Sequence, residues 1–188
     1  MEAQRTGAGR ANALKRELVT RVEERSAAPA DIAYEVLSDL QSHLIWAGER
    51  QGKKTRLTSV EAPEGPAVVG TEFVTTGADP MGTFRDTSVV TEASRPSVFE
   101  FVTEATLTTK KGTATHWTLV HLYDIAREGS GCRIAYTERV TRMSELPGMV
   151  AIFNVPGLST LLLRFSKRIT RRSIHNLARL SEERASAR

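Results

Sequence analysis

The residues of this 188-residue chain that are best suited to chemistry are a histidine, a tyrosine and a glutamate in two neighbouring strand-like stretches. His121 lies in the first stretch, Tyr136 and Glu138 lie in the second, and Gly129-Ser130-Gly131 separates them. Because a glycine-rich segment of this kind is typical of a hairpin turn, we expect the two stretches to pair as antiparallel strands. Two registers are then plausible: one sets His121 opposite Tyr136, and the other sets it opposite Glu138.

A carboxylate inside a protein is stable only when it is paired or hydrogen-bonded. Glu138 beside His121 would stabilise an imidazolium, or would hold the neutral ring in one tautomer. Such a pair could act as general acid and base in enolisation, aldol cyclisation or dehydration, so His121, Tyr136 and Glu138 are the candidate catalytic residues. The same residues also fit a polar network without catalysis, or a glutamate that reaches water at the mouth of a cavity.

Glu24, Arg85 and Asp86 lie in stretches that alternate poorly, so the sequence leaves open which way they face. An inward Arg85 could bind an enolate or a carboxylate, and an inward Asp86 or Glu24 could act as a base. Charged residues on strands are more often solvated or paired across the sheet, and we expect this of most of the three.

Metal and phosphate chemistry are not expected. His116 and His121 face opposite sides of one strand, and no group of His, Cys and Asp has the spacing of a metal site. Gly129-Ser130-Gly131 joins two strands, whereas a phosphate-binding loop or a nucleophile elbow joins a strand to a helix. We therefore expect no metal and no cofactor, and an enzyme built on this chain would be cofactor-independent.

The compartment predicted for the chain is cytoplasmic. Cys132 is the single cysteine, so no intramolecular disulfide can form, which favours a reducing compartment. Residues 1–16 lack the apolar run of a signal peptide and are expected to form a flexible tail. The most apolar stretch, residues 149–163, is interrupted by polar residues and is too short to cross a bilayer.

From Thr55 onward, alternating Thr- and Val-rich segments separated by Gly, Pro and charged turns predict an antiparallel sheet. A short charged strand precedes them, and Ala28-Pro29-Ala30-Asp31 is typical of a helix start. A second short helix is expected over residues 42–46. With the first strand included, we expect about seven strands, over residues 17–26, 56–61, 68–76, 84–93, 98–107, 115–126 and 132–142.

Alternation also predicts the inner face of the sheet, because neighbouring side chains on a strand point to opposite sides. On the strand 68–76 the inner residues are expected to be Val69, Thr71, Phe73 and Thr75. On later strands they include Phe99, Phe101, Trp117, His121, Tyr123, Tyr136 and Glu138. Inward aromatic side chains can stack on a planar ligand or form plain core. The candidates for lining a cavity are Trp46, Phe73, Phe101, Trp117 and Tyr123.

Residues 158–188 are predicted to form a long amphipathic helix. Residues 159–188 hold eight Arg or Lys against two Glu, a balance of +6 that leaves −2 for the rest of the chain. A basic face can attract nucleic acid or anionic lipid, but it is more often the solvated side of the helix, so nucleic acid is not an expected partner. The apolar stripe comprises Leu158, Leu162, Phe165, Ile169, Leu177 and Leu180.

Local motifs add a family resemblance to this order of elements. Ser26-Ala27-Ala28-Pro29 and the helix-like run 32–39 up to Trp46 resemble the opening of START-like (SRPBCC) proteins. The segments 69–73, 90–101 and 131–134 agree with later parts of the same pattern, and the resemblance spans roughly residues 18–180. Within this superfamily the chain is most similar to bacterial polyketide cyclase/dehydrase-like proteins.

The resemblance implies an α+β helix-grip fold, in which a curved antiparallel sheet wraps around a long C-terminal helix and two short helices follow the first strand. It also implies an internal cavity for a small hydrophobic or aromatic molecule, either a lipid or a polyketide-like compound. We expect one ligand-binding domain over residues 17–185. The expected lining residues are the aromatic candidates above together with Leu162, Phe165 and Ile169 of the helix.

Two other functions stay open at this stage. The chain could be an aromatic polyketide cyclase or dehydratase that uses its inward acid and base residues, or a regulatory module that acts through its basic helix. The apolar segment 143–156 is expected to form a short helix that closes one end of the cavity. It could instead lean on a membrane or on a second subunit, which would give peripheral membrane contact or a homodimer.

Overall fold

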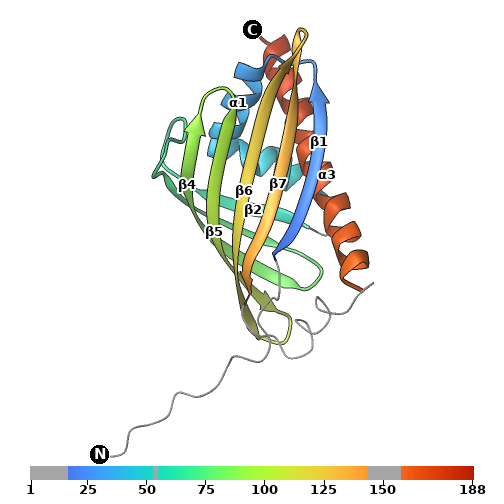
Figure 1. Ribbon diagram of the computed structural model, residues 1–188. Helices are drawn as coiled ribbons and strands as arrows, with labels where there is room; N and C mark the ends of the chain where they lie inside the picture. Colours follow the sequence, from blue (N-terminus) through green and yellow to red (C-terminus); the bar gives the residue numbers. More distant parts are fainter. Residues whose placement is uncertain (1–16, 53–54, 144–157) are drawn as a thin grey trace, which may run out of the picture.

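The computed structural model describes residues 17–52, 55–143 and 158–188, and it gives only the backbone for residues 158–163, 165 and 166. Within the described chain, antiparallel strands form one curved seven-stranded sheet in the order β1-β7-β6-β5-β4-β3-β2, and α3 runs beside β1 (Figure 1). This is the predicted α+β helix-grip arrangement. The elements are β1 Leu18–Ser26, α1 Ala30–Ser38, η1 Leu40–Ser42, η2 Leu44–Glu49, β2 Arg56–Glu61, β3 Glu72–Ala78, β4 Gly82–Ser94, β5 Val98–Thr109, β6 Ala114–Glu128, β7 Gly131–Met143 and α3 Leu158–Ser186.

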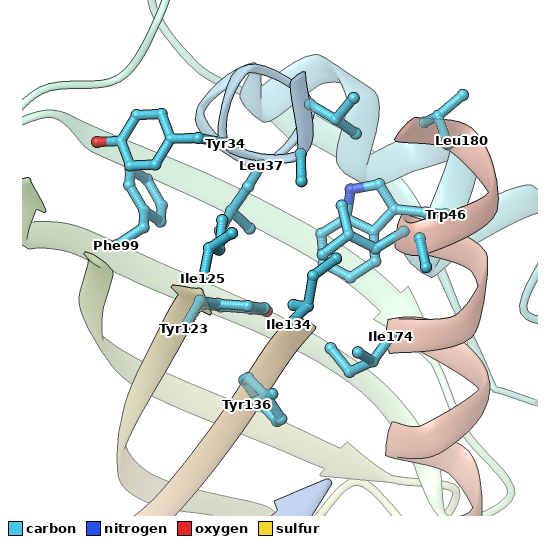
Figure 2. Packing of buried hydrophobic residues seen from close by; sticks show 14 of the residues in the cluster. Tyr34, Leu37, Trp46, Phe99, Tyr123, Ile125, Ile134, Tyr136, Ile174 and Leu180 are labelled. Carbon is cyan, nitrogen blue, oxygen red and sulfur yellow. The ribbon is translucent and has the colours of Figure 1, made fainter. Parts of the chain in front are cut away.

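The inner face of the sheet and the helices enclose a large apolar core (Figure 2). Phe99 of β5, Ile134 of β7 and Leu177 of α3 have exposed fractions of 0%. Phe101 and Leu107 are buried on the same face as Phe99, which confirms the inner face predicted for β5. Burial of apolar side chains from both sheet and helix is the main contribution to holding the two together.

A smaller apolar cluster lies apart from this core. It joins Leu18 of β1 to Val140 and Met143 of β7, and Trp117 and Leu119 of β6 pack against it. All five side chains come from three adjacent strands, β1, β7 and β6.

An irregular helical segment follows α1. The second short helix predicted over residues 42–46 is present as η1 and η2, which are a 3-10 turn and a π turn. Two side-chain bonds fix this segment to α1: Ser42 Oγ donates to the Val36 carbonyl, and His43 Nε2 donates to the Leu37 carbonyl at 2.9 Å. His43 and Trp46 are each 3% exposed as a result.

The strand predicted from Val68 begins four residues later, at Glu72. Val68 and Val69 are each 62% exposed, so placing Val69 on the inner face was wrong. The reason is a turn in which the Thr71 N–H donates to the Val68 carbonyl, with Gly70 at a φ of 86°. Only after this turn does alternation hold, and Phe73 and Thr75 are buried as predicted.

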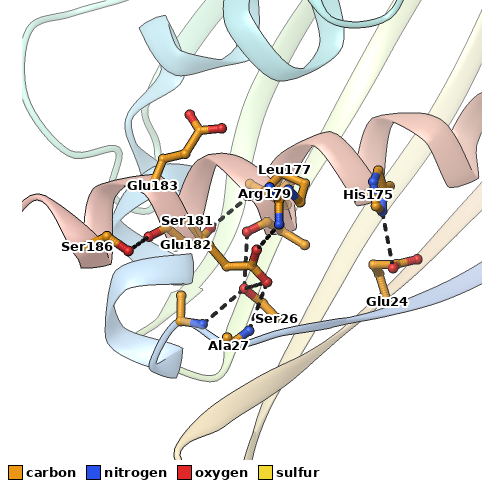
Figure 3. Close-up of polar contacts among 12 residues, drawn as sticks. Glu24, Ser26, Ala27, His175, Leu177, Arg179, Ser181, Glu182, Glu183 and Ser186 are labelled. Atoms are coloured by element: carbon orange, nitrogen blue, oxygen red, sulfur yellow. Dashed lines mark hydrogen bonds and ion pairs between the residues drawn. The ribbon is translucent and has the colours of Figure 1, made fainter.

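Polar contacts anchor α3 to the end of β1 (Figure 3). Ser26 Oγ donates to the Ala178 carbonyl at 3.1 Å, and the Ala27 N–H donates to Glu182 Oε1 at 3.0 Å. Glu24, whose orientation the sequence leaves open, accepts a hydrogen bond from His175 Nδ1 at 3.3 Å. The carboxylate of Glu24 therefore faces the helix.

The apolar stripe of α3 is confirmed at Leu177 and Leu180, which are buried, and Ile169 is half-buried. Ile174 and Ala178, which the predicted stripe omits, are also buried. The side chains of Leu158, Leu162 and Phe165, the tail 1–16 and most of the apolar segment 143–156 lie outside the described residues. Among the helices that are described, none is long and apolar enough to cross a membrane.

Candidate ligand cavity

A cavity of about 230 Å³ lies between the inner face of the sheet, η2 and α3. Strands β2 to β7 contribute one wall, and Ile169, Thr170, Ser173 and Ile174 of α3 contribute the opposite one. The other described residues that line it are His43, Trp46, Ala47, Gln51, Thr55, Arg56, Leu57, Phe73, Thr75, Phe84, Asp86, Ser88, Phe101, Thr103, His121, Tyr123, Tyr136 and Glu138.

Aromatic rings make up much of the wall. Phe101 lies at the centre, with its ring centroid 5.3 Å from that of Phe73 and 4.6 Å from that of His121, the latter nearly parallel. Tyr123 and Tyr136 approach each other at 4.7 Å. Such an arrangement offers both ring faces and ring edges to a planar ligand.

The pairing of β6 with β7 selects one of the two expected registers. His121 is opposite Glu138, and Tyr123 is opposite Tyr136. The hydroxyl of Tyr136 nevertheless lies between the other two groups, 2.6 Å from His121 Nδ1 and 3.2 Å from Glu138 Oε2. The three predicted catalytic residues thus form a hydrogen-bonded chain in which tyrosine links imidazole to carboxyl.

Burial sets the protonation of this chain. It lowers the pKa of His121 to about 3, with a smaller contribution from nearby His43, so the imidazole is neutral at physiological pH. Burial also raises the pKa of Glu138, although the hydrogen bond from Tyr136 acts in the opposite direction. The pKa of Tyr136 is raised well above 10.0, mainly by burial, so its hydroxyl keeps its proton.

Two proton arrangements are compatible with the hydrogen bonds that link His121, Tyr136 and Glu138. When Glu138 is ionised, Tyr136 donates to it and His121 Nδ1 donates to Tyr136, which leaves Nε2 as a hydrogen-bond acceptor. When Glu138 is protonated, the direction of both bonds can reverse, and Nε2 then carries the proton. The two arrangements differ by one proton. When His121 Nε2 takes a proton from a ligand, Nδ1 can pass its own proton to Tyr136 and Tyr136 can pass its own to Glu138, so His121 changes from a base to an acid without a charge on the ring.

His43 is a lining residue that the sequence analysis missed. Its Nε2 donates to the Leu37 carbonyl, and its ring lies 4.7 Å from that of Trp46. Burial lowers the pKa of His43 to about 4, so this ring is also neutral. The signal that could have found it is its position in the predicted helix over residues 42–46.

The structure separates Arg85 from Asp86. Arg85 is exposed, and its Nη1 atom lies 4.0 Å from Glu61 Oε1, whereas Asp86 lines the cavity. Burial raises the pKa of Asp86 to about 7. Among the described residues, its buried Oδ1 atom has no hydrogen-bond partner. The sequence names Asp86 as a possible base and leaves its facing open.

The predicted lining residues divide into three groups. Trp46, Phe73, Phe101, Tyr123 and Ile169 line the cavity. Trp117 packs in the smaller cluster with Leu18, Val140 and Met143, so the structure does not bring it to the cavity. The side chains of Leu162 and Phe165 lie outside the described residues. Within the part of the chain that is described, no three His, Cys, Asp or Glu residues gather as metal ligands would.

Comparisons with known proteins address the fold. No protein-family model matches the sequence, and no curated protein matches it. Solved structures do match. A conserved protein from Geobacillus kaustophilus has a TM-score of 0.64 at 12% identity, with 88% of this chain and 96% of that chain covered. The Zhui aromatase/cyclase from Streptomyces sp. R1128 has a TM-score of 0.62 at 16% identity, covering 90% and 96%. An uncharacterised protein from Rhizobium leguminosarum has a TM-score of 0.59 at 16% identity, covering 92% and 97%.

These matches extend over nearly the whole of both chains, and they establish a shared helix-grip fold. At such low identity the fold is all that they establish, because one fold hosts many functions.

Proposed function

We propose that this protein is a START-like (SRPBCC) domain that binds a small hydrophobic or aromatic molecule in the cavity between its sheet and α3. The observation that carries the proposal is the cavity itself, which is lined by Trp46, Phe73, Phe101, Tyr123 and Tyr136. The polyketide cyclase-like character predicted from sequence motifs is part of the same proposal. The likeness to an aromatase/cyclase structure supports it at the level of fold.

The size of the cavity limits the ligand. Its volume of about 230 Å³ exceeds the roughly 150 Å³ of a cavity that binds benzene, and it is below the roughly 300 Å³ at which drug-sized pockets begin. A molecule with one or two fused rings fits this range.

Native mass spectrometry of the purified full chain tests the proposal, with and without an added neutral probe such as 2-naphthylmethanol. We expect a one-to-one complex. Ser173→Phe, which adds a ring at a half-buried lining position of α3, should abolish that complex. Ser186→Phe, at an exposed position of the same helix, should leave it intact. Equal binding by both variants, or no binding by the unchanged protein, would contradict the proposal.

The hydrogen-bonded chain of His121, Tyr136 and Glu138 favours a second candidate function, acid-base catalysis of the cyclase or dehydratase type. A neutral imidazole that can exchange its proton through a tyrosine could remove a proton next to a ligand carbonyl and return it elsewhere. Exchange of the α-protons of 2-naphthylacetone for deuterium, followed by proton NMR, tests this directly. We expect Tyr136→Phe and His121→Ala to slow exchange by about a hundredfold. Unchanged exchange with the ketone still bound would exclude this function.

A further inference from the structure

Three described residues that line the cavity have a buried polar atom without a hydrogen-bond partner: Trp46 (Nε1), Gln51 (Oε1) and Asp86 (Oδ1). Asp86 is the one among them that can carry a charge. It lies in the middle of β4, opposite Thr75 of β3 and Ala105 of β5. Within the described part of the chain, its Oδ1 atom is buried without a hydrogen-bond partner and no cation forms an ion pair with it. Buried polar atoms are nearly always hydrogen-bonded, and an isolated buried carboxylate is costly. A carboxyl group in this state suits a site that receives a hydrogen-bond donor.

The charges around Asp86 indicate what kind of donor. Glu138 of β7 adds a second carboxyl group to the same cavity. The titratable groups facing the cavity from the other elements are His43, Tyr123, His121 and Tyr136, which are neutral, and α3 contributes only uncharged described residues. Arg56 is the sole cation among the described lining residues, and it is exposed. The buried part of the cavity thus favours positive charge over negative charge.

The aromatic wall has the same preference. The faces of Trp, Tyr and Phe rings carry negative potential and attract an ammonium group, most strongly when water is excluded. Trp46, Phe101 and Tyr136 are each 7% exposed or less and line the cavity. A cation held between rings and a carboxyl group is stabilised by both.

Resting on the proposed function, we infer that the ligand is an arylalkylamine, whose ring system packs among Phe73, Phe101 and Tyr123 and whose protonated nitrogen donates a hydrogen bond to Asp86. The neutral and acidic character of the cavity then selects amines over carboxylic acids of the same shape.

Three naphthalene probes of matched size test this inference in calorimetric titrations of the full chain. They are 2-naphthylmethylamine, which is cationic, 2-naphthylmethanol, which is a neutral donor, and 2-naphthoate, which is anionic. We expect the amine to bind about tenfold or more tightly than the alcohol, because a charged hydrogen bond to a buried carboxylate replaces a neutral one. We expect the naphthoate to bind most weakly.

Asp86→Asn keeps the shape of the side chain and removes its charge, so it should erase the preference for the amine. Asp124→Asn is the matched control, because Asp124 is an exposed acid of β6. Thermal unfolding of each variant checks that it is folded. Should Asp86→Asn fail to fold, the order of the three probes on the unchanged protein still decides the outcome.

The pH dependence gives an independent readout. The pKa of Asp86 is raised to about 7, so amine binding should strengthen from about pH 5 to about pH 8 as the carboxylate forms. An alkylamine stays protonated throughout this range, and both cavity histidines stay neutral. Because the pKa of Glu138 is also raised, the Glu138→Gln variant measures how much Glu138 contributes to the pH dependence of amine binding. Asp86→Asn should flatten the profile for the amine.

The outcomes separate the two levels of the proposal. If the alcohol binds as tightly as the amine, or the amine preference survives in Asp86→Asn, the inference is wrong while the cavity function stands; a water molecule on Asp86 would give that result. If none of the three probes binds, the proposed function fails, and this inference fails with it.

Discussion

Asp86 and His121 line one cavity, yet burial moves their pKa values in opposite directions. Burial favours the neutral form of each group, because the charged form loses its hydration inside the protein; His121 stays neutral at physiological pH, whereas Asp86 ionises around pH 7. The two residues therefore respond to pH with opposite signs, and a variant of each separates their effects.

The stability effect of Asp86 should grow with pH. Its pKa is 3.8 ordinarily and about 7 in the folded protein, so this half-buried carboxyl group destabilises the fold above pH 3.8 and increasingly so up to about pH 7. We expect Asp86→Asn to raise the free energy of unfolding by at most about 4 kcal/mol at neutral to alkaline pH, and to have little effect near the ordinary pKa. Urea unfolding at several pH values measures this. A gain that did not vary with pH would contradict it, and Asp124→Asn should show no gain.

His121 should lower the stability of the protein at acid pH. Its pKa is 6.5 ordinarily and about 3 in the fold, so the folded state loses stability as the pH falls below 6.5. His121→Gln keeps a hydrogen-bonding group near Tyr136 and removes the titration, so its unfolding free energy should fall less steeply with acid. The exposed His116, changed in the same way, is the control. If the slopes of both variants matched the unchanged protein, the buried neutral state of His121 would be wrong.

Alternation in the sequence was enough to bring His121, Tyr136 and Glu138 together, but it could not show that the tyrosine hydroxyl links the other two. Asp86 stayed unresolved because the run Arg85-Asp86 places charges on both faces of β4. His43 was missed because it lies in an irregular turn without a regular period. Trp117 shares the inner face with His121 but lies four residues away, about 13 Å along a strand. Alternation predicts on which face of the sheet a side chain lies, but it does not predict how far along the strand a ligand cavity extends.

At the scale of elements, the hairpin of β6 and β7 and the anchoring of α3 meet at Gly131. A Cβ atom at this position would lie 2.2 Å from the Ser26 carbonyl oxygen, and Ser26 is the residue whose hydroxyl binds α3. The glycine is therefore required by a close approach of β1 to the turn.

Gly131→Ala should destabilise the protein by about 1–3 kcal/mol, because β1 must move away and its contacts with α3 loosen. Ser130→Ala, at the exposed neighbouring position, should be nearly neutral. Chemical unfolding monitored by circular dichroism compares the two. Equal stabilities would show that the close approach is not maintained in solution.

The boundaries of the elements were predictable where the pattern was local. Pro29 marks the start of α1, and the strand predicted over residues 56–61 agrees with β2. Val69 was misplaced because Gly70 permits a turn that apolar alternation does not reveal. Ile174 was omitted from the helix stripe although α3 buries it against the cavity.

For the molecule as a whole, the basic residues of α3 and the C-terminal Arg188 divide into those that form ion pairs and those that are exposed. Arg179 and Arg184 pair with Glu182 and Asp39, and Arg188 pairs with Glu35. Arg164, Lys167, Arg168, Arg171 and Arg172 are exposed. Only Arg184 and Arg188 thus pair the C-terminal end with α1 and the residue after it, whereas most of the positive charge that the sequence concentrates here is exposed.

Several predictions about the whole chain stay predictions. They are the single domain over residues 17–185, the flexible tail, the cytoplasmic location, a homodimer, peripheral membrane contact, the regulatory role of the basic helix and the expectation that nucleic acid is not a partner. The fold was predictable because the order of strands and helices follows from local patterns. The volume and polarity of the cavity depend on how distant side chains pack, which such patterns do not determine.

The central claim is that an aromatic molecule binds inside the cavity, and the two tryptophans of the chain offer a direct test. Trp46 lines the cavity, whereas Trp117 lies in the separate apolar cluster. Fluorotryptophan labelling gives each its own fluorine NMR signal, which Trp117→Phe assigns. Addition of 2-naphthylmethanol should shift the Trp46 signal and leave the Trp117 signal in place. An unmoved Trp46 signal at saturating probe, or equal shifts of both signals, would contradict the account.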